Sequence, residues 1–501
     1  MLSKVHSASI YGFSSELVEV ECDAANSLPS IVIVGLASKS VDEAKDRVRS
    51  AIKNSGLNLP AKKFTINLAP ANLPKSGTGY DLAIAVALLI SSGQVTQSAA
   101  AKLAFCSELG LDGSLRPIFG VLSHVKRLHA LGYTVVVSPK NLAEAQLIKD
   151  ASIYAPTNLK QLYRVLIGEE KLRTNQSVPS SQLNDPSILD MGEISDQDQA
   201  KRALQIAAAG GHNVLMNGPP GSGKTMLARA FGGILPPMNK QEIVETTMIH
   251  SMSAQNNFEV VRTRPFRAPH HTASAISLIG GGSDPKPGEV SLSNHGVLFL
   301  DELPEFSRNV VESLRQPLED GHVTISRAKG STQFPARFTL IATKNPCPCG
   351  YLTDPDIACK CSAAQIERYK SRLSGPLLDR FDLLLEVGRI PSKKILRKSG
   401  PDESKTMQSN VKKARDIQSK RFNSTTKLNS HMNNKDLKTH LSIDTEAKEF
   451  LDSAADTLKL SARGYMRTLK VSQTIADLDD IRTISKNHIA EALQYRFKEV
   501  E

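Results

Sequence analysis

The sequence has no long hydrophobic run. The longest continuous apolar segment, Leu82 to Ile90, has nine residues, far fewer than the roughly twenty that a membrane-spanning helix requires. Nothing at its start has the pattern of a secretory signal peptide. These absences predict a cytoplasmic protein that does not span a membrane.

Aromatic residues and cysteines are also scarce. Tryptophan is absent and aromatic residues make up 5% of the chain, a scarcity that does not distinguish one function from another. Four of the six cysteines fall between residues 347 and 361. A disulfide framework is not expected, because a reducing cytoplasm disfavours disulfides.

Acidic residues are outnumbered, and the imbalance is local. The chain has 62 Lys and Arg against 51 Asp and Glu, a net charge of +11, and residues 390–440 hold 13 of the basic residues against 4 acidic ones. Such a run suits a contact with nucleic acid or another polyanion. Its Ser-, Asn- and Lys-rich composition equally fits a solvated, partly disordered insertion, so both interpretations stay open.

The 501 residues are enough for about two to four domains. Over residues 1–168, short apolar strands alternate with helical stretches; Ser15–Cys22, for example, alternates apolar residues with glutamate, the period of a half-buried strand. Residues 169–198 are rich in Ser, Gln, Asn, Asp and Pro, which predicts a linker. The rest divides into a βα series over 199–390, a basic insertion over 391–440 and a helical part over 441–501.

The segment GPPGSGKT fits the phosphate-loop pattern G-x-x-x-x-G-K-[S/T]. It follows a short apolar strand, His212 to Met216, and opens a helix, the setting in which backbone N–H groups wrap phosphate oxygens. Lys224 would reach the β- and γ-phosphates, and the Thr225 hydroxyl would ligate Mg²⁺. The expected nucleotide-binding residues are Gly218, Pro219, Pro220, Gly221, Ser222, Gly223, Lys224 and Thr225.

Two later apolar strands end in polar residues suited to ATP hydrolysis. Val297 to Glu302, VLFLDE, ends in two carboxylates. Asp301 is expected to hold Mg²⁺, and Glu302 to polarise the attacking water as general base. Asn345 follows the strand pattern of Phe338 to Thr343, where its side chain could orient that water.

Two arginines could complete the site. Arg380 precedes an apolar strand, and from there it could neutralise transition-state charge on a neighbouring subunit's γ-phosphate, as an arginine finger does. Arg463, on a helix near the C-terminus, could reach the phosphates from a lid. Taken singly such arginines are more often surface residues, and it is the order of elements that supports these roles.

With these motifs the chain resembles the ComM/YifB family of magnesium-chelatase-like AAA+ ATPases. The resemblance is carried by GPPGSGKTMLARAF, RPFRAPHHTAS, GEVSLSNHGVLFLDELPEF, NPCPCG and SGPLLDRFDL, and it covers nearly the whole chain. It implies a multidomain α/β protein: an N-terminal α+β domain like the Lon protease and ribosomal protein S5, an AAA+ P-loop domain, and a C-terminal helical lid. It also implies Walker A and B roles for Lys224, Thr225, Asp301 and Glu302, sensor 1 at Asn345, the arginine finger at Arg380 and sensor 2 at Arg463, with Arg372 and Arg467 as substitutes for the last two.

The resemblance further implies a ring, expected to be a hexamer, that uses ATP and Mg²⁺. The implied role is DNA helicase or branch migration in homologous recombination during natural transformation, with single-stranded or branched DNA as partner. An insertion in the second helix and a hairpin, VTISRAKGSTQFPARF, would correspond to elements that line the pore of related rings. Arg327 and Lys329 near the hairpin tip would suit a DNA backbone; a plain surface hairpin is the alternative.

The N-terminal segment Pro74 to Asp81 is similar to the part of Lon that carries its nucleophile. Gly79 stands at the position of the nucleophilic serine, and Ser123 at that of the general-base lysine. Glycine cannot attack a peptide bond, and a serine cannot replace a lysine amine of depressed pKa. No peptidase activity is therefore expected; the domain would serve assembly or face DNA.

The cysteine cluster has the spacing C-x-C-x9-C-x-C, formed by Cys347, Cys349, Cys359 and Cys361. Two close pairs on one loop can converge on a tetrahedral ion, and thiolates suit Zn²⁺. Structural zinc is the expectation, because four cysteine ligands leave no position open for catalysis. Four reduced structural thiols are the alternative, since the pairs are not the commoner C-x-x-C.

Two other functions stay open. One is the motor subunit of a magnesium chelatase, which drives metal insertion into a porphyrin; the Lon-like domain and the cysteine cluster argue against it. The other is a remodelling ATPase that does not act on DNA and whose basic segment is only a solvated loop.

Overall fold

The computed structural model describes residues 2–35, 38–174, 189–253, 258–282, 285–327, 330–354, 356–390 and 402–496. The chain forms two compact units. The first consists of Met1–Gln182, Ile243–Val261 and Thr324–Phe334, and the second of Leu183–Glu242, Arg262–Val323 and Pro335–Glu501. Among the described residues, every helix is too short or too polar to cross a lipid bilayer.

The first unit is built on a seven-stranded mixed sheet of order β3-β4-β2-β1-β5-β8-β9. Along β5, Phe105 faces one apolar cluster while its neighbours Ala104 and Cys106 face another, so the sheet separates two core layers. The strands are β1 Ser3–Tyr11, β2 Ser14–Ala25, β3 Ser30–Val34, β4 Lys63–Ala69, β5 Leu103–Cys106, β8 Thr134–Val137 and β9 Ile153–Tyr154, with a small ladder of β6 Glu108–Leu109 and β7 Leu115–Arg116.

Helix α3 (Asp81–Ser91) fills the centre of one core layer. All of its residues are buried, which explains the uninterrupted apolar run, since a helix covered on every side needs no polar face. It packs on β1 and β2. The other helices of this unit are α1 Lys39–Asp42, α2 Ala44–Asn54, α4 Gln97–Ala100, α5 Val121–Ala130, α6 Leu142–Ala145 and α7 Leu159–Leu166.

Two segments from much later in the sequence belong to the first unit. One is most of helix α10 (Lys240–Ser251) with the residues after it, and the other is most of the hairpin β15 (His322–Arg327) and β16 (Gly330–Pro335). The backbone N–H of Gly120 donates to both the carbonyl oxygen and Oγ of Ser251 at 2.9 Å. The sequence placed both segments in the AAA+ core, whereas the structure groups them with the N-terminal sheet. Lys329 and the side chain of Arg327 lie outside the described residues.

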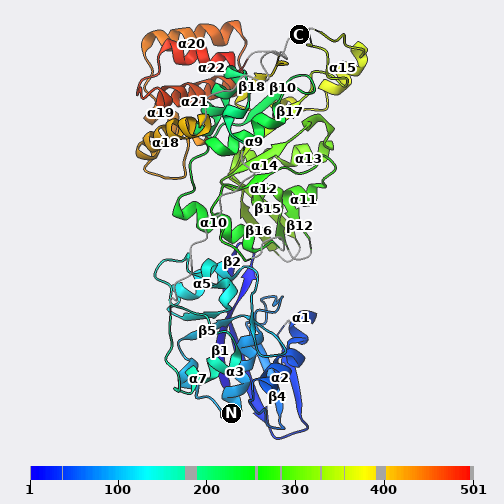
Figure 1. Cartoon of the computed structure of the whole chain (residues 1–501), viewed down its shortest axis with the longest axis vertical. Helices are drawn as coiled ribbons and strands as arrows, with labels where there is room; N and C mark the ends of the chain where they lie inside the picture. Colours follow the sequence, from blue (N-terminus) through cyan, green and yellow to red (C-terminus); the bar gives the residue numbers. More distant parts are fainter. Residues whose placement is uncertain are drawn as a thin grey trace. The chain divides into compact units, whose positions relative to one another are not determined.

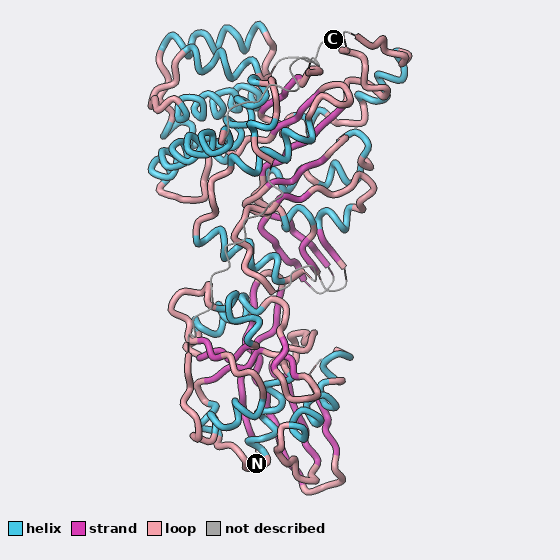
Figure 2. The backbone as a smooth tube through the Cα atoms, viewed as in Figure 1, coloured by secondary structure: helices cyan, strands magenta, loops and turns pink. Residues whose placement is uncertain are grey.

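The second unit contains a five-stranded parallel sheet of order β11-β14-β17-β10-β18. Because the strands are parallel, their carboxyl ends meet at one edge and their amino ends at the other. Figure 2 shows the strands in magenta with helices in cyan around them. The strands are β10 Val214–Asn217, β11 Phe266–Arg267, β14 Val297–Leu300, β17 Thr339–Lys344 and β18 Leu383–Glu386, beside a small ladder of β12 Gly280–Gly281 and β13 Lys286–Pro287. The helices around the sheet are α8 Asp198–Gly210, α9 Lys224–Ile234, α11 Ala275–Ile279, α12 Glu289–Leu292, α13 Arg308–Ser313, α14 Arg315–Asp320, α15 Ala363–Lys370 and α16 Gly375–Leu378.

A helical domain gathers beside this sheet (Figure 1). It consists of α18 Glu403–Phe422, α19 Asn434–His440, α20 Thr445–Thr457, α21 Ala462–Leu478 and α22 Lys486–Gln494. The interpretation of the basic segment as a solvated, partly disordered insertion is wrong for Glu403–Phe422, because α18 is a long helix that packs on α8, α9 and α21. Residues 391–401 lie outside the described part of the chain.

Several basic side chains of this segment make internal contacts. Arg415 donates to the carbonyl oxygen of Ala208 from Nε at 3.0 Å and from Nη2 at 2.6 Å. Arg421 donates hydrogen bonds to both carboxylate oxygens of Asp477, whose side chain is fully buried. The charge run is therefore partly structural, which the composition alone could not reveal.

Replacing Arg421 with alanine is expected to destabilise the helical domain by about 3 kcal/mol, because it leaves the buried Asp477 carboxylate without its cation. Removal of the exposed neighbour Lys420 should change stability by less than about 0.5 kcal/mol. Urea unfolding of the two variants measures the difference. Equal stabilities would mean that the Arg421 pair contributes nothing.

Candidate nucleotide-binding site

The segment GPPGSGKT connects β10 to α9, as the sequence predicted. Gly221 and Gly223 have φ values of 74° and 90°, the left-handed region that favours glycine. A Cβ on Gly218 would lie 2.1 Å from the carbonyl oxygen of Val387, so this position admits no side chain. The Ser222 Oγ is buried and has no hydrogen-bond partner within the described residues. The loop thus has the glycine conformations and the unpaired hydroxyl that suit a phosphate-binding loop.

The Lys224 amine contacts both the phosphate loop and Asn345. It donates to the carbonyl oxygens of Gly218 at 2.7 Å and Pro219 at 2.9 Å, and to Asn345 Oδ1 at 3.3 Å. Burial lowers the pKa of Lys224, while the charges of Asp301 and Glu302 oppose that shift. The phosphate loop and the end of β17 are therefore joined by one cation.

Asp301, at the end of β14, is held between two hydroxyl groups. Its Oδ2 accepts from Thr225 Oγ1 at 3.1 Å, and its Oδ1 accepts from Thr343 Oγ1 at 2.6 Å. The Thr343 oxygen also accepts from the backbone N–H of Glu302 at 2.8 Å. Thr225 and Asp301 supply the oxygen ligands that Mg²⁺ prefers.

Thr343 was not predicted as a site residue. The register of β14 and β17 pairs Leu300 with Ala342, which places the residues that follow side by side. A role for Thr343 can be predicted only once β14 and β17 are known to be neighbouring strands. Thr343 is buried and orients Asp301 and Glu302 rather than facing a substrate.

Glu302 has a left-handed backbone, with φ of 53°. This conformation is unfavourable for a residue with a side chain and is found disproportionately at functional sites. Its side chain is exposed next to Asp301. The carboxyl edge of the sheet therefore brings together Lys224, Thr225, Asp301, Glu302 and Asn345, all of which the sequence had selected.

Arg380 lies at the opposite edge of the sheet. It precedes β18, whereas the phosphate loop follows β10, and these two strands are parallel neighbours. The two edges are separated by a four-residue strand, roughly 10 Å at 3.3 Å per residue. Arg380 is almost fully buried and forms an ion pair with Glu319.

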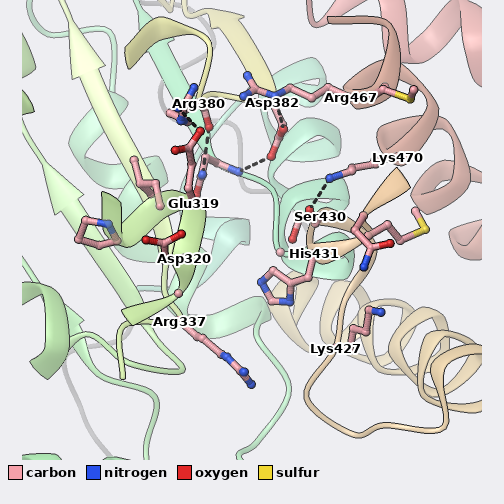
Figure 3. A pocket seen from close by; sticks show the side chains of 18 of the residues that line it. Glu319, Asp320, Arg337, Arg380, Asp382, Lys427, Ser430, His431, Arg467 and Lys470 are labelled. Atoms are coloured by element: carbon pink, nitrogen blue, oxygen red, sulfur yellow. Dashed lines mark hydrogen bonds and ion pairs between the residues drawn. The ribbon is translucent and has the colours of Figure 1, made fainter. Parts of the chain in front are cut away.

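Arg463 joins Arg380 at this edge. Its Nη2 lies 3.6 Å from the same Glu319 carboxylate, and its side chain is 60% exposed. Arg463 therefore lies beside Arg380, at the edge away from the phosphate loop, and its contact with the phosphates from a lid stays a prediction. Both arginines line a cavity of about 980 Å³, in which Figure 3 shows Arg380 and Arg467 beside Glu319 and Asp382. The basic residues that line it are Arg337, Arg380, Lys427, Arg463, Arg467 and Lys470.

The two substitute arginines have other partners. Arg467 donates to the carbonyl oxygen of Phe381 at 3.2 Å and lies 3.6 Å from Asp382. Burial of Asp382 opposes ionisation, yet the hydrogen bond with His212 and the charge of Arg467 lower its pKa to about 2, so Asp382 stays charged. Arg372 donates to Glu305 at 2.7 Å and to the carbonyl oxygen of Pro304 at 3.2 Å, just beyond Glu302.

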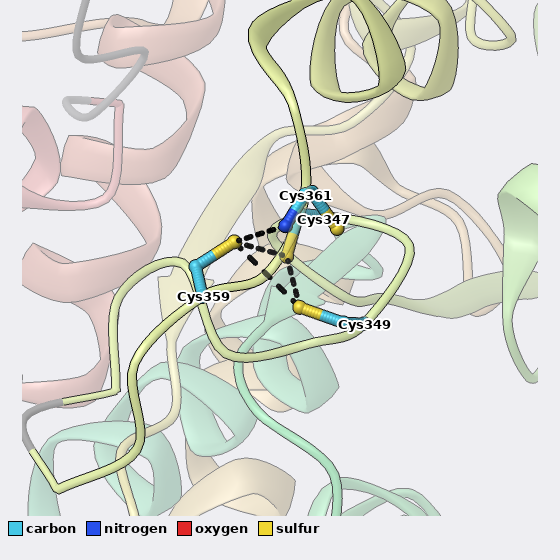
Figure 4. A group of neighbouring side chains, drawn as sticks. All are labelled: Cys347, Cys349, Cys359 and Cys361. Carbon is cyan, nitrogen blue, oxygen red and sulfur yellow. Dashed lines mark hydrogen bonds between the residues drawn. The ribbon is translucent and has the colours of Figure 1, made fainter.

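The four clustered cysteines converge (Figure 4). The sulfur of Cys347 lies 3.4 Å from Cys349 and 3.7 Å from Cys359, and the last two are 3.6 Å apart. All four sulfur atoms lie within 4.8 Å of one another. A tetrahedral Zn²⁺ with bonds of about 2.3 Å requires sulfur atoms about 3.8 Å apart, so the cluster fits one such ion.

The residues at the Lon-like positions offer no nucleophile. Gly79 precedes α3, and a Cβ added to it would lie 3.2 Å from Ile118 Cδ1. Ser123 lies on α5 and is buried. A serine–lysine pair is absent from these two positions.

Comparison with known proteins gives matches along almost the whole chain. Models described as subunit ChlI of magnesium chelatase match residues 20–141 and 190–395, and one for its C-terminal part matches 401–496. The chain is 44% identical to competence protein ComM of Haemophilus influenzae over 501 residues, 99% of this chain and 97% of that protein. It is 41% identical to the uncharacterized protein YifB of Escherichia coli over 497 residues, with the same coverage. The magnesium-chelatase 67 kDa subunit of Heliobacterium mobile is 30% identical over 190 residues, 32% of this chain and 28% of that protein.

Proposed function

Because this chain belongs to the ComM/YifB family of magnesium-chelatase-like AAA+ proteins, we propose that it is an ATP-driven motor that works as a hexameric ring on single-stranded or branched DNA. Its role would be helicase or branch migration in homologous recombination during natural transformation. The proposal of a ring is supported by the position of Arg380 and Arg463, which lie together at the edge of the sheet opposite the phosphate loop. From that edge, the two arginines would contact only a nucleotide that is bound to an adjacent copy of the chain.

The residues at the carboxyl edge then share the chemistry of hydrolysis. The loop N–H groups and Lys224 hold the phosphates, and Thr225 and Asp301 would hold Mg²⁺, which neutralises phosphate charge when bound. Glu302 takes the proton of the attacking water, and Asn345 orients that water. Arg380 and Arg463 of the adjacent copy stabilise the charge of the transition state. Thr343 keeps Asp301 and Glu302 in place through the hydrogen bonds described above.

The family models that match this chain are those of the chelatase subunit, but the individual relatives favour the competence function. The relative named for competence matches along 97% of its length, whereas the chelatase subunit of Heliobacterium mobile matches only about a third of this chain. We also propose that the N-terminal unit is a Lon-like domain without peptidase activity, since Gly79 and Ser123 replace the nucleophile and its base. Cys347, Cys349, Cys359 and Cys361 would bind structural zinc.

Strand displacement from a three-stranded branched DNA tests this function. We expect ATP hydrolysis to rise on adding single-stranded or branched DNA, and the branch to be resolved only with ATP. DNA binding should weaken steeply between about 50 and 200 mM salt, because phosphate contacts release counterions. An ATPase that binds no DNA even at low salt would exclude the helicase function and favour a remodeller of other substrates. A parallel assay for Mg²⁺ insertion into a porphyrin checks the chelatase alternative.

A further inference from the structure

We infer that the four-cysteine loop is a positioning element of the ATPase site, and that a zinc ion bound there sets the rate of hydrolysis. This inference rests on the proposed ATPase function. The loop begins at that site: Asn345, which the Lys224 amine contacts at 3.3 Å, is followed two residues later by the buried ligand Cys347. Any displacement of Cys347 is therefore transmitted to Asn345 through a single intervening residue.

The loop also touches the phosphate loop directly. Gly350, which follows the ligand Cys349, has a left-handed backbone with φ of 84°. A Cβ at Gly350 would lie 2.4 Å from Cδ of Pro220 in the phosphate loop. The backbone of the cysteine loop thus packs against GPPGSGKT with no space for a side chain between them.

The chain returns to the same site after the last cysteine. Cys361 leads into α15, whose buried Tyr369 lies beside the backbone of Asn345. Arg372, just beyond α15, lies over the Tyr369 ring and donates to Glu305, three residues after Glu302. The segment from 345 to 372 therefore forms a loop whose end lies near its start at Asn345. The four cysteines lie together between the two ends.

Apart from the cysteines, one arginine holds this loop: Arg389 forms an ion pair with Asp354 at 2.9 Å and lies over the Tyr351 ring. The described residues from 351 to 361 are all exposed or half-buried, so no apolar core holds them. An ion on four thiolates would close the loop and restrict its conformations. Because misplacement of a catalytic group by about 1 Å can cost about a hundredfold in rate, loss of the ion should act on hydrolysis more than on ATP binding.

The test is a Cys359→Ser variant, which removes a ligand remote in sequence from Asn345. We expect wild type to carry one zinc per chain by elemental analysis. The variant should lose that zinc and at least about tenfold in kcat, while the Kd for a non-hydrolysable ATP analogue changes less than about threefold. Cys359→His keeps a zinc ligand and should retain the zinc and most of the rate. Lys360→Ser, which changes the residue between two ligands, is the matched control and should behave as wild type.

The outcomes separate the inference from the proposed function. Zinc-free wild type, or loss of zinc with unchanged kcat, would overturn the inference and leave the ATPase function standing. A wild type that hydrolyses no ATP would overturn both. If Cys359→Ser fails to fold, chelation of zinc from the wild-type ring replaces it. A fall in kcat that returning Zn²⁺ reverses supports the positioning role, and an unchanged rate contradicts it.

Discussion

A Glu302→Gln variant should bind ATP and assemble but hydrolyse it at least about a hundredfold more slowly, the usual contribution of a general base. Glutamine keeps the shape of the side chain and its left-handed backbone at residue 302, so only the basic oxygen is lost. The Thr343 hydrogen bond to the backbone N–H of residue 302 remains. Steady-state phosphate release measures kcat, and binding of a fluorescent ATP analogue measures the Kd.

Glu367→Gln is the matched control for this variant. Glu367 is an exposed carboxylate on α15 in the same unit, so its replacement should leave both kcat and Kd unchanged. Hydrolysis retained by Glu302→Gln would remove Glu302 from the role of base. Loss of ATP binding in the same variant would instead indicate that the carboxylate supports the nucleotide pocket.

The sequence predicted those parts of the site whose residues are consecutive. GPPGSGKT and VLFLDE each contain a strand end and its functional residues within a few positions, so local pattern was sufficient to choose Lys224, Thr225, Asp301 and Glu302. Thr343 was missed because its role depends on which strand lies next to β14, and strand order is not a local property.

Partners that are distant in the sequence account for the other differences. The charge and composition of 390–440 left open a polyanion contact and a solvated insertion, yet Arg415 and Arg421 bind groups of this chain that lie more than fifty residues away. Arg463 was expected to reach the phosphates from a lid, and the sequence did not reveal that Glu319 holds it beside Arg380. In each case a tertiary contact decided the outcome, and composition carries no information about such contacts.

Mixing two inactive variants tests whether Arg380 acts between copies. Arg380→Ala alone should lose at least about a thousandfold in kcat, the typical contribution of an arginine finger. Glu302→Gln alone is inactive for the reason given above, yet its Arg380 is intact. If rings assemble at random from equal amounts, about a quarter of interfaces pair an intact Glu302 with an intact Arg380 from the neighbour. The mixture should therefore recover about a quarter of the wild-type rate.

An arginine that served its own chain would give the opposite result. Every subunit of the mixture would then carry one damaged group at its own site, and no recovery would occur.

Arg463→Ala should be complemented in the same way as Arg380→Ala, because one carboxylate, Glu319, holds both arginines at the same edge. Arg482→Ala, an exposed arginine elsewhere in the helical domain, should need no complementation. If activity recovers in the mixture with Arg380→Ala but not in the mixture with Arg463→Ala, only Arg380 acts on the nucleotide of the adjacent copy.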